Sequence, residues 1–138
     1  MALARMLLWS VALGVMLLVG CQQKSTELIH TTGKVRYKGA PLNTGIIVFS
    51  PDPTKGESGK IAVSKIEPDG TYTLKTEDKA GASAGWYRVS VVSLANAASA
   101  YDVVPMSYLP EKYRDPQQSL LQCEIKPNRD NHLDFNLD

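Results

Sequence analysis

The residue with the clearest chemistry in this chain is Cys21, which follows Gly20 at the end of an apolar run. The thiolate of a cysteine is a nucleophile that can form a thioether with a carbon electrophile. The small side chain of Gly20 leaves the preceding backbone accessible to a peptidase. The type and order of these two residues predict cleavage between Gly20 and Cys21 and modification of the thiol.

The segment before Cys21 has the form of an export signal. Arg5 supplies a single early positive charge, and residues 6–19 contain no charged side chain. This run has the length of a signal-peptide apolar region and is shorter than the roughly 20 residues that span a bilayer. Residues 1–20 are therefore predicted to be a signal peptide that is removed from the mature protein.

The motif Leu18-Val19-Gly20-Cys21 resembles the lipobox of bacterial lipoproteins. The resemblance implies a diacylglyceryl thioether on Cys21 and further acylation with chains such as palmitate. Three acyl chains exceed the two membrane signals that stable anchoring needs. The alternatives are an ordinary secretory signal with a chance cysteine and an uncleaved amino-terminal anchor. The mass of the mature amino terminus separates these three cases.

The residues after Cys21 are expected to form a lipidated tether. Residues 21–31 are mostly polar, and residues 22–31 reach at most roughly 33 Å at about 3.3 Å per residue. An Asp directly after the cysteine would resemble the inner-membrane retention signal of some bacteria. Gln22 stands there instead, which favours the outer membrane over the inner membrane. The protein is thus expected outside the cytoplasm, with membrane lipid as its first partner through acylated Cys21.

Charge is balanced along the chain. The whole sequence has 15 Lys and Arg against 14 Asp and Glu, and Arg5 is the only charged residue in 1–20, so the mature balance is 14 against 14. Because the two signs are interleaved, there is no basic stripe to neutralise a phosphate backbone, and nucleic acid is excluded as a partner. With no polybasic cluster, the acyl chains alone are expected to hold the protein at the membrane.

The remaining reactive side chains form no recognised constellation. Cys123 has no intrachain partner once Cys21 is acylated, so it is interpreted as a buried, inert side chain, with a reactive thiol or an intermolecular bridge as alternatives. His30 and His132 have no Cys, Asp or Glu at a metal-ligand spacing. Neither a nucleophile elbow nor a Gly-rich phosphate loop is present. We therefore expect no metal, no cofactor and no enzymatic activity.

Short strands must position these side chains. Beyond residue 31 the sequence divides into runs with period-two alternation, separated by Gly, Pro, Asp and Asn. The spacing predicts one domain, residues 32–138, that is an all-β, seven-stranded antiparallel β-sandwich. The seven predicted strands are 32–37, 45–50, 60–66, 71–76, 86–94, 119–125 and 132–137.

The alternation also predicts which side chains point inward. Residues 46–49 are apolar on both faces, which is typical of a central strand. Pro68-Asp69-Gly70 predicts a tight turn that pairs the third and fourth strands. The predicted inward set is Val35, Tyr37, Ile61, Val63, Tyr72, Leu74, Tyr87, Val89, Val91, Leu121, Cys123, Ile125, Leu133, Phe135 and Leu137.

Three segments together resemble the carboxypeptidase regulatory-like, or transthyretin-like, β-sandwich superfamily. They are residues 33–45, with Gly33-Lys34-Val35 leading to Gly39-Ala40-Pro41-Leu42; residues 69–74, Asp-Gly-Thr-Tyr-Thr-Leu; and residues 84–91, Ala-Gly-Trp-Tyr-Arg-Val-Ser-Val. The resemblance covers essentially the whole mature chain and is strongest to small bacterial lipoproteins of one such domain. Residues 109–116 resemble a segment before their penultimate strand. These motifs belong to turns and strand edges, so they imply a fold and no chemistry.

The resemblance implies a non-catalytic binding or structural module of the cell envelope. A carbohydrate-binding or transporter-associated accessory domain is the alternative. A remote alternative is the hydrolase branch of the transthyretin-like fold, which uses His and Arg residues and ends in Tyr-Arg-Gly-Ser. This chain ends in Leu-Asp-Phe-Asn-Leu-Asp at 133–138, so the sequence speaks against that activity.

The long loop 95–118, before the penultimate strand, is the remaining candidate site, since loops of this length are usually functional or disordered. Leu109 and Tyr113, at i and i+4, predict a short helical turn that packs over an open edge or face of the sandwich. Alternatively, Tyr108, Tyr113 and Arg114 present a surface to an envelope protein or a glycan, because Tyr and Arg are enriched at binding hot spots. Trp86, on the outward side of its strand, would extend that surface.

Overall fold

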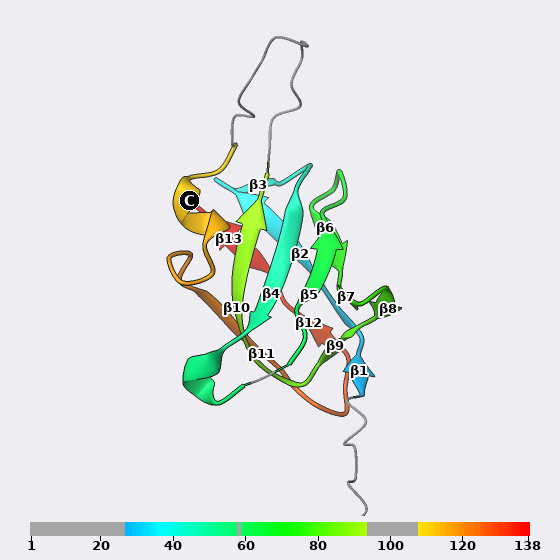
Figure 1. Ribbon diagram of the computed structural model, residues 1–138. Helices are drawn as coiled ribbons and strands as arrows, with labels where there is room; N and C mark the ends of the chain where they lie inside the picture. The colour runs from blue at the N-terminus through cyan, green and yellow to red at the C-terminus, as the bar shows by residue number, and fades with distance from the viewer. Residues whose placement is uncertain (1–26, 58, 94–107) are drawn as a thin grey trace, which may run out of the picture.

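The computed structural model describes residues 27–57, 59–93 and 108–138 (Figure 1). The prediction of an all-β fold with antiparallel sheets is confirmed, and the helical elements of these residues are two short 3-10 turns, η1 and η2. In chain order the elements are β1 (Leu28–Ile29), β2 (Thr31–Tyr37), β3 (Ala40–Pro41), β4 (Ile46–Pro51), η1 (Pro53–Lys55), β5 (Ala62–Lys65), β6 (Thr71–Thr73), β7 (Lys75–Thr76), β8 (Lys79–Ala80), β9 (Ala82–Ser83), β10 (Gly85–Val92), η2 (Glu111–Arg114), β11 (Leu121–Ile125), β12 (Asn131–His132) and β13 (Phe135–Leu137).

The strands form two larger sheets and one short pair. The first sheet has the order β11-β10-β4-β5-β7-β8. In the second sheet β2 is central and pairs with β12, β13, β3 and β6, while β1 and β9 form a separate pair. The prediction that 46–49 is a central strand is confirmed, because β4 lies between β10 and β5.

The end of the chain pairs in a direction that the sequence did not predict. β12 and β13 run parallel to β2, with Phe135 opposite Val35. The expectation of antiparallel pairing throughout is wrong for these two strands. A parallel neighbour requires a crossover connection, and the chain makes one after β11, where it leaves the six-stranded sheet for the other sheet.

The predicted strand 71–76 is divided between the two sheets. β6 pairs with β2, whereas β7 pairs with β5 through Val63 and Lys75. Leu74 lies at the switch between them and is fully buried. The turn through 68–70 forms as predicted and closes with a backbone hydrogen bond of 2.8 Å. Pairing of the third and fourth predicted strands is thus confirmed for β7 and wrong for β6.

The third strand has the opposite phase to the one predicted. Ile61 and Val63, expected inside, are 53% and 42% exposed, while Ala62 and Ile66 are buried. Ala62 lies opposite Phe49 of β4, and directly opposite residues of a sheet share a face. The large Phe49 ring faces the core, so the small Ala62 must face it too. The register with β4 therefore decides the phase, against local hydrophobicity.

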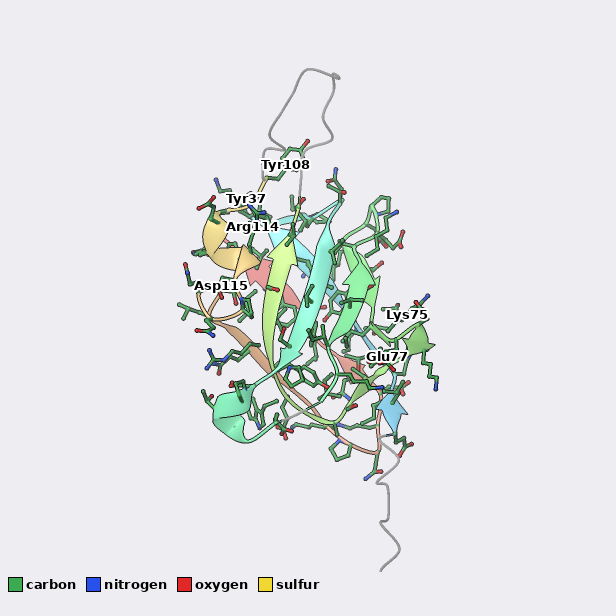
Figure 2. All side chains as sticks on the ribbon, in the orientation of Figure 1. Tyr37, Lys75, Glu77, Tyr108, Arg114 and Asp115 are labelled. Carbon is green, nitrogen blue, oxygen red and sulfur yellow. The ribbon has the colours of Figure 1, made fainter. Side chains whose placement is uncertain are left out.

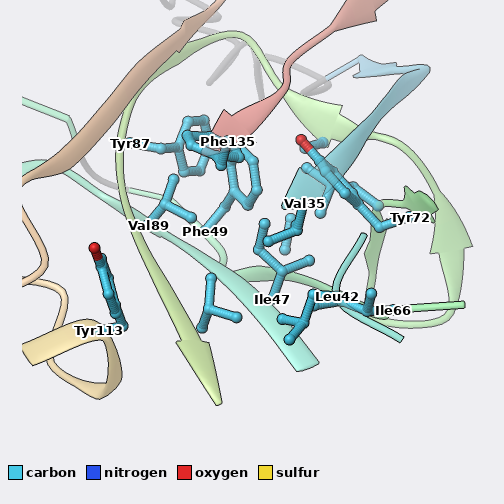
Figure 3. Packing of buried hydrophobic residues seen from close by; sticks show 14 of the residues in the cluster. Val35, Leu42, Ile47, Phe49, Ile66, Tyr72, Tyr87, Val89, Tyr113 and Phe135 are labelled. Carbon is cyan, nitrogen blue, oxygen red and sulfur yellow. The ribbon is translucent and has the colours of Figure 1, made fainter. Parts of the chain in front are cut away.

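The core lies between the inner faces of the two larger sheets and is centred on Phe49 (Figure 3). The Phe49 ring lies 5.9 Å from those of Tyr87 and Phe135 and 6.0 Å from that of Tyr72. Edge and tilted contacts at these distances are favourable for aromatic pairs. The predicted inward residues that are buried are Val35, Tyr72, Leu74, Tyr87, Val89, Val91, Ile125, Phe135 and Leu137.

The sheets begin earlier than the predicted domain boundary. Leu28 and Ile29, assigned to the tether, pair with Ser83 and Ala82 of β9. Ile29 is buried in the core. These contacts place β1, with the first described residues, at one end of the molecule (Figure 1).

Candidate functional site

The predicted lipidation site lies outside the described residues. Gly20 and Cys21, which carry the predicted cleavage and acylation, belong to residues 1–26. Most of the loop 95–118 also lies outside, since residues 94–107 are not described. Within 27–57, 59–93 and 108–138 there is no helix with the length and apolarity needed to cross a membrane.

The described end of that loop packs against the sheets. Leu109 and Tyr113 are 3% and 2% exposed and belong to the hydrophobic core. Tyr113 lies in η2, which packs against β10. This arrangement agrees with the packing role considered for the segment. Because its ring is buried, Tyr113 offers little surface to a partner.

Tyr113 also fastens the carboxyl terminus. Its hydroxyl donates to the side-chain carboxylate of Asp138, and the Asp138 N–H donates back to the hydroxyl at 3.1 Å. Lys112 Nζ lies 3.3 Å from the same carboxylate. The hydrogen bond from Tyr113 and then that from Lys112 hold the pKa of Asp138 below its ordinary value. The chain end and η2 therefore stabilise each other.

The structure separates the other predicted surface residues. Tyr108 is 57% exposed, and Arg114 is exposed on η2. Both lie toward the end of the molecule opposite β1 (Figure 2). Trp86 is half-buried at the start of β10 and lines a different hollow from Tyr108. The four residues considered as a partner surface do not form one patch.

A groove at the far end from β1 contains Tyr108. It has a volume of about 600 Å³ and is bordered by Tyr37, at the end of β2 (Figure 2), and by the chain after the β2–β3 turn. Lys38 Nζ lies 5.3 Å above the Tyr37 ring, so Tyr108 is the more open aromatic platform. The lining residues are Tyr37, Ala40, Pro41, Leu42, Asn43, Thr44 and Tyr108.

None of the described residues that line this far-end groove has a charged side chain. Its polar side chains are those of Tyr37, Asn43, Thr44 and Tyr108, and each of them both donates and accepts hydrogen bonds. Of these four residues, the sequence pattern indicated Tyr108 as a site residue and did not indicate the other three. Asn43 and Thr44 follow a turn motif in the sequence, where such residues are ordinary, so no local signal marks them.

A second, larger hollow lies beside β1. This tether-end pocket has a volume of about 910 Å³ and combines aromatic, aliphatic and oppositely charged side chains. This pocket could not be predicted from the sequence, because its lining residues come from segments far apart in the chain. The lining residues are Glu27, Leu28, Ile29, Pro51, Glu57, Gly59, Lys60, Thr76, Glu77, Lys79, Ser83, Ala84, Trp86, Tyr87 and Pro127.

A buried ion pair fixes the loop that follows β4. The Asp52 side chain is 1% exposed, and its Oδ1 lies 3.2 Å from Arg88 Nε. The same oxygen accepts hydrogen bonds from the hydroxyl and N–H of Thr54 at 2.7 and 3.0 Å, which caps η1. The hydrogen bond from the Thr54 hydroxyl is the main reason that the pKa of Asp52 lies below its ordinary value. The arrangement positions this loop beside Trp86.

The thiol of Cys123 and the imidazole of His132 both belong to described residues. Burial raises the pKa of the half-buried Cys123 thiol to about 12, which leaves very little thiolate at neutral pH. His132 Nε2 lies 3.1 Å from Asp134 on the exposed surface. Among the residues that the structure describes, no three His, Cys, Asp or Glu side chains are grouped to hold a metal ion.

Comparison of the chain with protein-family models, with curated proteins and with solved structures finds no match. The fold itself defines the class of protein, which is an all-β domain with a hollow at each end. Its function has to be argued from the chemistry of these two hollows.

Proposed function

We propose that this chain is a lipid-anchored, extracytoplasmic module of the cell envelope with a transthyretin-like sandwich fold, and that it binds neutral glycans without catalysing a reaction. Acylated Cys21 would hold the protein at a bacterial membrane, by preference the outer membrane. The far-end groove would hold the glycan.

The observation that carries this proposal is the placement of the groove. The amino-terminal segment joins the fold at β1, whereas Tyr37 and Tyr108 lie toward the opposite end (Figures 1 and 2). An anchor on Cys21 would thus leave the groove pointing away from the bilayer. A binding surface at the end opposite the tether is the arrangement that suits an envelope receptor or spacer.

The chemistry of the lining supports a neutral, hydroxyl-rich ligand. A pyranose ring has an apolar C–H face that stacks on an aromatic ring, and each of its hydroxyls both donates and accepts hydrogen bonds. The exposed Tyr108 ring supplies the platform, and the Asn43 amide and Thr44 hydroxyl match such hydroxyls. The described lining residues carry no carboxylate, imidazole, thiol or ammonium group.

Affinity electrophoresis tests the glycan proposal. The purified protein is run in native gels that contain dextran, glycogen or glucomannan, with polygalacturonate as the acidic counterpart. We expect retardation by at least one neutral polysaccharide, and Tyr108→Ala should weaken it about tenfold, equivalent to about 1.4 kcal/mol. Leu120→Ala, at an exposed residue outside the groove, is the control. Equal mobility of wild type and Tyr108→Ala in every gel would point to a structural spacer.

The anchor is tested separately by mass spectrometry of the mature amino terminus. A Cys21 that carries a diacylglyceryl group and an amide-linked acyl chain is the expected result. Cys21→Ser should abolish the lipid and release the protein from the membrane fraction. An intact Met1 or a terminus at another residue refutes the anchor and leaves the glycan measurement unaffected.

A further inference from the structure

The tether-end pocket is built partly from the segment that would lead to the membrane. Glu27 and Leu28 line it, and β1 holds Leu28 in place by pairing with β9. From Cys21 to Glu27 the chain advances six residues, which span at most about 20 Å when extended. If Cys21 is acylated, this pocket lies within that distance of the lipid headgroups.

Charged side chains of both signs line the pocket. Glu27, Glu57 and Glu77 supply carboxylates, and Lys60 and Lys79 supply ammonium groups. Lys60 and Glu77 form an ion pair at 2.5 Å, but both side chains are more than 60% exposed. Exposed pairs of this kind are weakly held, so each partner is available to a ligand. None of the ion pairs in the described part of the chain involves Lys79.

The tether-end pocket also has apolar lining residues of types that suit the boundary between water and a membrane. Trp86 and Leu28 both line it. Lys55 Nζ lies 4.7 Å above the Trp86 ring and covers one of its faces. Tryptophan is enriched where an apolar environment meets water, as at a membrane surface. A ligand with a cationic end, an anionic end and an attached apolar part therefore fits this lining.

Resting on the lipid anchor of the proposed function, we propose that the tether-end pocket binds the phosphoethanolamine headgroup of a membrane phospholipid. The phosphate contacts Lys60 and Lys79, and the ammonium contacts Glu57 and Glu77. A primary ammonium has three N–H donors for these carboxylates, whereas the trimethylammonium of choline has none. Binding of the headgroup would fix the orientation of the domain on the bilayer, with the far-end groove outward.

The fluorescence of Trp86 reports on this pocket directly. The chain contains two tryptophans, Trp9 and Trp86, and Trp9 lies in the predicted signal peptide. The full chain with Trp9→Phe therefore has Trp86 as its single reporter whether or not that peptide is removed. This protein, in maltoside detergent, is titrated with water-soluble glycerophosphoethanolamine. We expect a saturable change in emission. Lys79→Ala and Glu57→Gln should each weaken binding roughly tenfold, as expected for loss of one charge-assisted contact.

Matched controls make the titration decisive. Lys65→Ala removes an exposed lysine of the same sheet outside the pocket and should leave the affinity unchanged. Glycerophosphocholine and glycerophosphate should bind about tenfold more weakly, because each lacks the ammonium donors. Absence of a saturable change, or equal affinity of wild type, Lys79→Ala and Glu57→Gln, overturns the proposal. If glycerophosphate binds with the same affinity as glycerophosphoethanolamine, the site recognises phosphate alone, and this result also overturns the proposal.

Vesicles test the source of the headgroup. For the protein reconstituted through its anchor, Trp86 emission should differ between vesicles of pure phosphatidylcholine and vesicles that contain phosphatidylethanolamine. A response to the soluble headgroup without any difference between the vesicles would overturn the membrane as its source. Because the soluble titration needs no acyl chain, its failure is distinguishable from failure of the anchor, which appears in the mass of the amino terminus.

Discussion

The two ends of this domain carry hollows of opposite chemical character. The far-end groove is uncharged in its described lining and offers hydroxyl and amide groups, including those of two tyrosines. The tether-end pocket contains carboxylates and ammonium groups around a tryptophan. Tyr37 of β2 lines the groove, whereas Pro51 of β4 and Trp86 of β10 line the pocket, and these three strands run from one end of the domain to the other (Figure 1).

The contrast shows where a small β domain has freedom to carry function. Within the strands, alternate residues must fill the core around Phe49, which leaves little choice of side chain. At the strand ends, the turns and terminal segments are released from that alternation. The side chains at one end can therefore differ without changing the hollow at the other end.

The largest effect is expected at the far end from Tyr113→Ala. Its ring is 2% exposed, and removal of a buried aromatic side chain costs about 3–5 kcal/mol. Urea denaturation should show this loss, whereas Tyr108→Ala, at an exposed ring, should stay within about 0.5 kcal/mol of wild type. A stable Tyr113→Ala protein that loses a binding partner would instead return Tyr113 to the partner surface.

A smaller effect is expected at the tether end from Gly81→Ala. Gly81 has φ +103°, and a Cβ there would lie 2.8 Å from the Ile29 carbonyl oxygen. The strained backbone and this clash should lower the free energy of unfolding by about 1–3 kcal/mol and open the β1–β9 pair. Hydrogen exchange at Leu28 and Ile29 should accelerate. Gly39→Ala is the matched control, since Gly39 has φ +84° with no atom within 4 Å of the added Cβ. Equal losses for both variants would contradict the contact with Ile29.

Acid should affect the two ends unequally, with the smallest change at the far end. The pKa values of Asp52 and Asp138 lie below their ordinary value of 3.8, so both stabilise the folded state above that pH. This stabilisation is lost as the pH falls through 3.8 toward the lower folded pKa values. Asp52 is buried in its ion pair, whereas the Asp138 side chain is 91% exposed.

Free energies of unfolding measured at pH 7 and pH 3 check this inequality. Asp52→Asn keeps a capping side chain for η1 and should flatten the acid dependence more than Asp138→Asn does. An unchanged slope in Asp52→Asn would show that the buried ion pair does not govern acid stability.

The sequence predicted those features that are set by near neighbours. Alternation placed Tyr87, Val89 and Val91 inside, and the turn at 68–70 formed where Gly and Asp predicted it. The inverted phase of β5 escaped prediction because it depends on the register with Phe49 of another strand. The sequence pattern indicated Tyr108 and Trp86 as site residues. It did not indicate that they lie in two separate hollows.

The sequence by itself determined an all-β chain of short strands, and it predicts a lipid anchor at Cys21, because periodicity, turn residues and a signal motif are local properties. The tertiary structure decided the parallel placement of β13, the burial of Tyr113 and the two hollows. The tether-end pocket joins Leu28, Glu57, Lys79 and Pro127. These segments are far apart in the sequence and come into contact only when the sheets have formed. No short stretch of sequence contains the information that such long-range contacts require.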